Sequence, residues 1–315
     1  MNKTLILIHG RSWKPEKSSL RSLWLDAIRS GLKRDNIEAY NRFSNVKVEF
    51  VYYGDINNVF LEKALDKPWV DDSDSRRITL EQLKGYTAGQ FTKRNYNRLP
   101  GKESFKEGAA DVLSPILHFF NLSEALIAEV APDMKEYWTL SGRGNLGTEV
   151  RRQMIKPLKR ALDRDGSTAI VAHSLGTMIA YDTLWKFSHY GEWYDYWDKK
   201  VDLFLTLGSP LGDVTVQEHL KGREAEKAMK YPWNIRKWVN IAAEDDYISH
   251  DSKISDDYRK MKRHVLLESI RDYKIYNLSV RYDEDGKGKS NPHHSGGYLI
   301  HPTTARVVAD WILAP

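Results

Sequence analysis

The chain contains no cysteine among its 315 residues, and no apolar run approaches the roughly 18 residues that a transmembrane helix needs. The missing cysteine excludes disulfide bonds, thiolate catalysis and cysteine-ligated metal sites, and it agrees with a reducing compartment. The first apolar stretch, residues 4–8, is too short for the apolar core of a signal peptide and is typical of a buried strand. We therefore expect a cytoplasmic protein.

Strong charge of either sign is also missing. The net charge is +5, with 41% hydrophobic and 29% charged residues, which is typical of a globular protein with a substantial core. A mild positive excess permits attraction to anionic surfaces but does not require it. An aromatic-rich segment, residues 185–197, permits peripheral contact with a membrane. No nucleic-acid-binding motif accompanies that excess, so no nucleic acid is expected as a partner. The oligomeric state stays open.

Apolar runs and helical patterns alternate along most of the chain. Leu5–Ile8 and Ala169–Ala172 are continuous apolar runs, as in strands that are buried on both faces of a parallel sheet. Further strands are expected at 46–53, 201–207, 237–243 and 274–280, and helices at 19–34, 150–162, after residue 176 and at 302–314. This alternation predicts an α/β fold with a doubly wound, mostly parallel sheet in a single domain of residues 1–315.

Residues 55–145 interrupt the alternation without a convincing strand. Helical patterns are expected at 111–120, 123–130 and around 134–138. A segment of this length inside an α/β fold predicts a mainly helical cap or lid insertion. Lysine and arginine are in excess between Arg76 and Lys106, which favours a solvated face; the alternative is contact with an anionic substrate or lipid.

The stretch Thr168–Met178 (TAIVAHSLGTM) joins an apolar run to a helical pattern through a turn that carries Ser174. Small residues, Ala172 and Gly176, stand two positions before and after that serine. This layout of strand, serine turn and helix is that of a nucleophile elbow, in which alanine is a mild departure from the usual glycine. The alternative is an ordinary strand-to-helix connection.

An acidic loop follows the strand predicted at 237–243. Asp246 is the favoured candidate for an acid that orients a histidine, because Ile248 can turn back into the core two residues later. Asp245 is the second candidate. A solvated loop is the alternative for any of these acids.

A glycine-rich loop at 283–289 leads to His293 and His294, just before the closing helix. Either histidine could act as a general base, and we favour His293. Exposed side chains, or a metal site, are the alternatives. No third ligand stands nearby at suitable spacing, so no metal and no cofactor is expected. His301 precedes Pro302 and is interpreted as a helix-entry residue.

In its core the chain resembles α/β-hydrolase fold serine hydrolases of the esterase and lipase type. The resemblance covers residues 1–54 and 146–315 and depends on five stretches: His9-Gly10, Ala172–Gly176, Leu205–Pro210 (LTLGSP), Asp245-Asp246, and a late histidine before Gly297-Tyr298-Leu299. It implies an oxyanion hole formed by the backbone N–H groups of Arg11 and Leu175.

The resemblance also implies a function. We expect hydrolysis of a carboxylic ester, carried by a small molecule or a lipid, through Ser174, Asp246 and His293 or His294, with an acyl-enzyme intermediate. Hydrolysis of an amide, thioester or lipid acyl group, and acyl transfer, are alternatives in the same fold. A non-catalytic binding protein that retains the fold is a further alternative.

Overall fold

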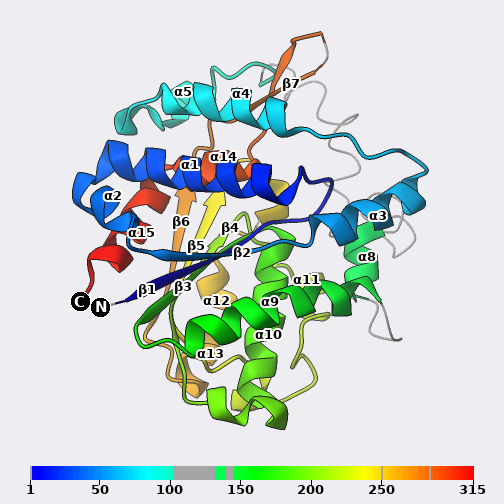
Figure 1. The fold of residues 1–315 in the computed structure, drawn as a ribbon, viewed down its shortest axis with the longest axis vertical. Coiled ribbons are helices and arrows are strands. Elements are labelled where there is room, and N and C mark those ends of the chain that lie inside the picture. The colour runs from blue at the N-terminus through cyan, green and yellow to red at the C-terminus, as the bar shows by residue number, and fades with distance from the viewer. Residues whose placement is uncertain (1, 103–131, 139–144, 250, 284) are drawn as a thin grey trace.

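Six parallel strands form the central sheet of the molecule, in the spatial order β2-β1-β3-β4-β5-β6 (Figure 1). The computed structural model describes residues 2–102, 132–138, 145–249, 251–283 and 285–315. The strands of the sheet are β1 (Lys3–Ile8), β2 (Lys47–Val51), β3 (Ser167–His173), β4 (Val201–Leu207), β5 (Ile235–Ala243) and β6 (Ser269–Ile275). The predicted α/β class and the parallel sheet are confirmed. The helices expected at 111–120 and 123–130 lie outside the described residues.

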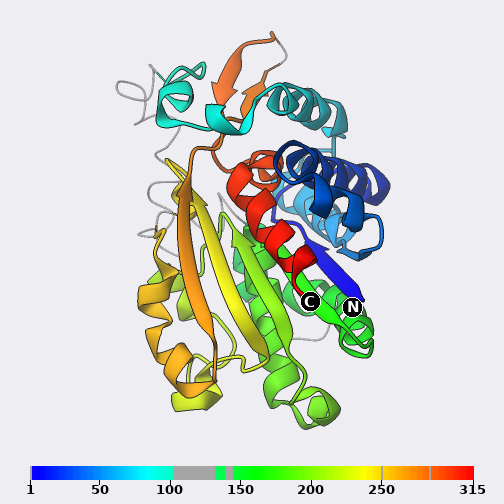
Figure 2. The ribbon, with the colours of Figure 1, turned by 90° about the vertical axis from the view of Figure 1, so that its left-hand side faces the viewer.

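Helices cover both faces of the sheet (Figure 2). One face carries α1 (Lys17–Asp35), α2 (Ile37–Phe43), α14 (Ser295–Ile300) and α15 (Pro302–Leu313), and α4 (Ser73–Lys84) packs on α1 and α14. The other face carries α3 (Gly54–Leu65), α8 (Pro132–Trp138), α9 (Leu146–Leu162), α10 (Leu175–His189), α12 (Ile254–Asp257) and α13 (Arg259–His264). Short elements complete the described chain: η1 (Ala88–Gln90), α5 (Lys93–Tyr96), η3 (Gly191–Tyr196), α11 (Val214–Gln217), η4 (Lys227–Lys230) and η5 (Tyr247–Ser249).

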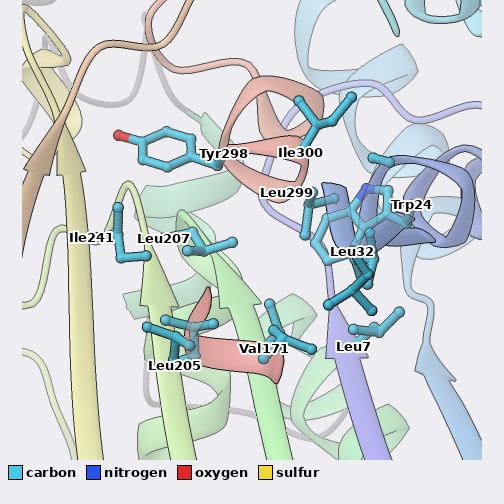
Figure 3. Packing of buried hydrophobic residues seen from close by; sticks show 14 of the residues in the cluster. Leu7, Trp24, Leu32, Val171, Leu205, Leu207, Ile241, Tyr298, Leu299 and Ile300 are labelled. Carbon is cyan, nitrogen blue, oxygen red and sulfur yellow. The ribbon is translucent and has the colours of Figure 1, made fainter. Parts of the chain in front are cut away.

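Side chains alternate between two hydrophobic clusters, one on each face of the sheet. Leu5, Leu7 and Val171 pack with α1 and α14, as Figure 3 shows for part of that cluster, whereas Ile6 and Ile170 belong to the opposite cluster. A strand buried on both faces needs apolar residues at every position, which explains the continuous apolar runs of β1 and β3. These strands were predictable for that reason.

The last strand of the sheet differs from its prediction. It spans Ser269–Ile275 and not 274–280, and its alternating polar residues are partly exposed because β6 is an edge strand. Val280 instead begins β7 (Val280–Tyr282), which pairs with β8 (Gly288–Ser290) in an antiparallel hairpin. The glycine-rich loop at 283–289 is thus the turn and second strand of this hairpin.

The described residues of segment 55–145 pack against the helices on both faces of the sheet. Helix α3 contacts α8 and α9, while α4 lies against α1, α14 and strand β7 (Figure 1). Both helices were missed in the sequence, where the segment showed only polar stretches before residue 107. The described residues of this segment therefore border the carboxyl end of the sheet from two sides.

Candidate active site

The candidate site lies where the winding of the sheet reverses. From β1 the chain crosses to β2 on one side and, later, to β3 on the other side of β1. The carboxyl ends of β1 and β3 therefore leave a crevice between them, and ligands of open α/β sheets bind in such crevices. A cavity of about 510 Å³ opens there, within the usual range for small-molecule sites.

Ser174 occupies a strained turn between β3 and α10. Its backbone angles are φ 55° and ψ −129°, a conformation that non-glycine residues rarely adopt. Two close approaches shape the turn. A Cβ at position 176 would lie 2.3 Å from the His9 carbonyl oxygen, and one at position 10 would lie 2.7 Å from Ser174 Cβ. Glycine is therefore required at both positions.

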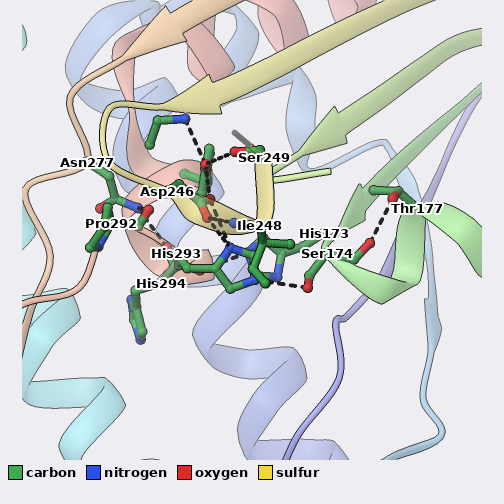
Figure 4. A network of polar contacts seen from close by, with 12 residues as sticks. His173, Ser174, Thr177, Asp246, Ile248, Ser249, Asn277, Pro292, His293 and His294 are labelled. Carbon is green, nitrogen blue, oxygen red and sulfur yellow. Dashed lines mark hydrogen bonds and ion pairs between the residues drawn. The ribbon is translucent and has the colours of Figure 1, made fainter. Parts of the chain in front are cut away.

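A series of hydrogen bonds runs from Ser174 to a buried carboxylate (Figure 4). Ser174 Oγ lies 2.9 Å from His293 Nε2, and His293 Nδ1 lies 3.0 and 2.9 Å from the two carboxylate oxygens of Asp246. In the neutral ring, Nδ1–H donates to the carboxylate and Nε2 accepts from the hydroxyl. An imidazole in this arrangement can take the serine proton while the carboxylate holds its tautomer.

Asp246 is fixed on three sides. Its side chain has no solvent exposure, and besides His293 it accepts hydrogen bonds from the Ile248 N–H at 3.0 Å and the Tyr298 hydroxyl at 2.5 Å. Asp245, the other candidate acid, faces away from His293. Its carboxylate accepts a hydrogen bond from the Tyr96 hydroxyl at 3.1 Å and pairs with Lys102.

The two adjacent histidines have different environments. The His294 ring is directed away from Ser174 (Figure 4), and its Nδ1 lies 3.5 Å from Ser279 Oγ. Burial, together with the nearby Arg76 guanidinium, lowers the pKa of His294 to about 3, so the ring is neutral. Of the two candidate bases, the structure brings only His293 to the serine.

His173 was not singled out in the sequence, although it directly precedes Ser174. Its Nε2–H donates to the His293 carbonyl oxygen at 3.0 Å. Burial, with a smaller contribution from His293, lowers the pKa of His173 well below its ordinary value. The neutral His173 ring therefore ties the backbone of His293 to the serine turn.

His9 performs a similar role in the loop after β1. Its Nδ1–H donates to the Gly10 carbonyl oxygen at 2.8 Å, and its Nε2 accepts from the Tyr53 N–H at 3.2 Å. Burial and the positive charge of Lys14 lower the pKa of His9 well below the ordinary range. A neutral ring with a fixed tautomer thus holds the backbone that approaches Ser174.

Lys14 and Asp133 anchor the rest of this loop. Lys14 Nζ donates to the carbonyl oxygens of residues 11, 12 and 13. Burial and the Arg76 guanidinium lower the pKa of Lys14 to about 7. Burial opposes ionisation of Asp133, but Arg11 and the Ser12 N–H outweigh it and hold the pKa of that carboxyl below its usual value.

Two backbone N–H groups were predicted to bind a developing oxyanion. Leu175 is the first residue of α10, so its N–H has no acceptor within the helix and lies next to the Ser174 hydroxyl in the chain. Arg11 follows Gly10, where an added Cβ would lie 2.7 Å from Ser174 Cβ. The Arg11 side chain is directed into an ion pair with Asp133 at 2.8 Å, and Arg11 lines the same cavity as Ser174.

Sequence reasoning missed His173, Tyr298, Lys14 and Asp133. His173 could have been found from its position beside the serine, and Tyr298 from its spacing of five residues after His293. Nothing in the local pattern around Lys14 or Asp133 pointed to a buried charge. The partners of Asp133 come from a distant segment, and Lys14 binds backbone carbonyl groups of its own loop, which no residue pattern marks.

No protein-family model matches this chain, and no curated protein matches it. Among the described helices, none combines the length and apolar character needed to cross a bilayer. Within the same part of the chain, no three His, Asp or Glu side chains are grouped as metal ligands would be.

Proposed function

We propose that the protein is a serine hydrolase of the α/β-hydrolase fold, which cleaves carboxylic esters through Ser174, His293 and Asp246. The observation that carries the proposal is the hydrogen-bonded series from Ser174 Oγ to His293 Nε2 and from His293 Nδ1 to Asp246. The order of these residues along the chain, serine before aspartate before histidine, is the order that the fold requires.

The reaction would begin with attack of Ser174 Oγ on the ester carbonyl carbon. His293 Nε2 takes the hydroxyl proton as the new C–O bond forms, and Asp246 stabilises the resulting imidazolium. The carbonyl oxygen becomes an oxyanion, to which the N–H groups of Leu175 and Arg11 would donate. One such donor contributes on the order of 100- to 1000-fold to the rate.

Collapse of this intermediate breaks the bond to the alcohol oxygen. His293 returns its proton to the leaving alcohol, and the acyl group stays on Ser174. Water then attacks the acyl-enzyme, giving its proton to His293, and the second collapse releases the carboxylic acid and restores the serine. An alcohol or amine in place of water would give acyl transfer by the same steps.

Labelling with a neutral fluorophosphonate tests the proposal directly. The purified protein should become covalently labelled, and the Ser174→Ala variant should not. Ser290→Ala, a serine of the same cavity with no hydrogen bond to His293, is the matched control and should label like the parent. A folded parent protein that fails to label would contradict the proposal and favour a binding protein that retains the fold.

Paired variants test the assignment of the acid and the base. Asp246→Asn should lower kcat on p-nitrophenyl acetate by roughly 10⁴-fold, because the histidine loses its tautomer and its counter-charge. Asp245→Asn should keep most of the activity, since Asp245 faces Lys102. His293→Gln and His294→Gln form the second pair, with activity lost only in the first. Equal losses within either pair would contradict the assignment.

A further inference from the structure

The lining of the cavity is strongly basic. Besides Asp245 and Asp246, its charged residues are Arg11, Lys14, Arg76, Arg281 and Lys289. Three of these cations have partners in the protein: Arg11 pairs with Asp133, Arg76 pairs with Asp72, and Lys14 is held by backbone carbonyl groups. Both carboxylates are also engaged, by Lys102 and by His293. The two cations of the lining that are still to be considered are Arg281 and Lys289.

Arg281 and Lys289 lie directly opposite each other on the β7–β8 hairpin. Side chains at such positions share one face of the hairpin, with Cβ atoms about 5 Å apart, and like charges there repel. Both side chains are exposed, and neither meets a carboxylate in the described part of the chain. Two cations held together, with no carboxylate partner among residues 2–102, 132–138, 145–249, 251–283 and 285–315, favour the binding of an anion.

The opposite face of the hairpin is firmly attached to the protein. Val280 is buried, and its carbonyl oxygen accepts a hydrogen bond from Thr79 Oγ1 of α4 at 2.8 Å. The Tyr282 hydroxyl accepts from Gln82 Nε2 of the same helix at 3.0 Å. The Ser290 N–H donates to the Pro100 carbonyl oxygen at 2.9 Å. The hairpin lies beside α4 (Figure 1), and these contacts make it a fixed support for the two cations.

The hairpin also leads directly to the proposed base. Only three residues separate Lys289 from His293, and both side chains line the same cavity as Ser174. A molecule whose ester group reaches Ser174 can thus extend toward the two cations. Leu20 and Trp24 of α1 line another part of the wall and offer apolar contact to the uncharged portion of the molecule.

We infer that the substrate is an ester whose remaining part carries a carboxylate or a phosphate, and that Arg281 and Lys289 bind this anionic group. The inference rests on the proposed hydrolase function, because it names the substrate class of the same site. Arginine can bind two oxygens of either anion through its planar guanidinium, while lysine acts as a point charge. A cavity that holds both the reacting serine and the two cations favours a small anionic molecule over a membrane surface.

The inference is tested by binding to the Ser174→Ala variant, which separates recognition from chemistry. Two esters of equal acyl length are compared by calorimetry: p-nitrophenyl hydrogen adipate, which carries one carboxylate, and neutral p-nitrophenyl hexanoate. The adipate ester should bind about tenfold more tightly, because it gains charge-assisted hydrogen bonds. Adding Arg281→Gln and Lys289→Gln should abolish this preference and leave binding of the hexanoate ester unchanged.

A matched pair of substitutions controls for net charge. Lys260→Gln with Arg263→Gln removes the same charges from exposed positions of α13, outside the cavity lining, and should keep the preference. The preference should also weaken from about 0.1 M to about 1 M salt, because the screening length falls from about 10 Å to about 3 Å. Equal binding of the two esters, or a preference that survives in the Arg281/Lys289 variant, would overturn the inference.

A phosphate arm distinguishes the two anions. Glycerol 3-phosphate acetylated at its first hydroxyl is compared with acetylated glycerol in the same variants. The larger of the two preferences, for the carboxylate over its neutral ester or for the phosphate over its neutral ester, identifies the anion that the hairpin binds. Sedimentation with phosphatidylglycerol vesicles is the last arm. Hairpin-dependent binding to vesicles, with no preference between the paired esters, would overturn the inference in favour of a membrane contact.

These experiments distinguish failure of the proposed hydrolase function from failure of the anion-site inference. If Ser174 is not labelled by the fluorophosphonate while the adipate ester still binds through Arg281 and Lys289, the hydrolase proposal fails and the anion site stands. If labelling and hydrolysis of neutral esters depend on Ser174 but the cations have no effect, the hydrolase proposal stands and the inference fails.

Discussion

The Tyr298 hydroxyl donates a 2.5 Å hydrogen bond to the same Asp246 oxygen that receives the His293 ring. Tyr298 and His293 belong to one segment, in which the loop before α14 carries the histidine and the helix carries the tyrosine. This segment holds the acid from two directions. The position of α14 therefore sets the distance between Asp246 and His293.

Tyr298→Phe should lower kcat by about 10- to 100-fold and leave KM nearly unchanged, because the lost bond to a charged group is worth about 1.5–3 kcal/mol. Without the Tyr298 donor, the negative charge of Asp246 is less neutralised and stabilises the protonated ring of His293 more strongly. The acid limb of the pH–rate profile should therefore move to higher pH. Tyr258→Phe, which removes a buried hydroxyl bonded to Leu211, is the control. An unshifted acid limb in Tyr298→Phe would mean that Tyr298 is only a packing residue.

Ser174→Gly should be more stable than Ser174→Ala, because glycine adopts the backbone angles of this turn without strain. The difference in the free energy of unfolding should be about 1–3 kcal/mol, measured by urea denaturation. Ser188, within α10, provides the opposite case. There glycine should be less stable than alanine, by about 1 kcal/mol. If the glycine variant were more stable than the alanine variant at both positions, or less stable at both, the serine turn would not be strained.

Acid should destabilise the protein through its buried histidines. Burial lowers the pKa values of five of them: His9, His173, His189, His294 and His301, with those of His294 and His301 lowered to about 3. The unfolded chain takes up protons below about pH 6.5, whereas these folded rings stay neutral, so stability falls as the pH falls. Each of the rings of His9, His173, His294 and His301 should contribute up to about 2 kcal/mol of loss between about pH 7 and pH 5.

His301→Asn isolates one of these groups. The His301 ring accepts a hydrogen bond from the Thr303 N–H at the start of α15, and asparagine can cap a helix in the same way. The variant should lose less stability between about pH 7 and pH 5 than the parent, by about 2 kcal/mol. An unchanged pH dependence would show that His301 does not titrate as its burial requires.

Lys14 should produce an alkaline limb in the pH–rate profile. Its pKa is lowered to about 7, mainly by burial, and above that pH the amine has one donor fewer for the three carbonyl groups of the loop. Hydrolysis of p-nitrophenyl acetate should therefore slow as the pH rises above about 7, as the Arg11 loop loosens. Lys14→Met should show a low rate without this limb.

Stability distinguishes this effect from alkaline unfolding. An unfolded lysine keeps its proton to about pH 10.4, so the folded state gains stability as the pH rises from about 7 toward that value. The rate should thus fall while the unfolding midpoint in urea rises. An alkaline limb that persists in Lys14→Met would assign it to another group.

Buried parallel strands were the most predictable part of the fold. Strands β1, β3, β4 and β5 are buried on both faces, so their apolar runs can be recognised in the sequence. Ligand sites of open α/β sheets form at the carboxyl ends of such strands. Ser174, Asp246 and His293 were all proposed because each follows a strand in the required order. Strand β6 was placed five residues too late because an edge strand lacks a continuous apolar run.

The choice between neighbouring side chains was beyond the sequence. His293 and His294 differ only in which way each ring turns, and contacts from distant segments set that direction. Asn277 Nδ2 donates to the carbonyl oxygens of Pro292 and His294, and His173 donates to that of His293. The β7–β8 hairpin was missed because its strands are three residues each and need α4 to support them.

The polar character of β6 has a consequence for the solubility of the folded protein. Strands β2 and β6 are the edges of the sheet, and an uncovered edge can pair with the edge of another molecule. Arg271 and Lys274 are exposed along β6, and Glu49 of β2 is paired with two arginines of the α9 region. Charges that must be desolvated oppose edge-to-edge association, so the apolar central strands stay protected from aggregation.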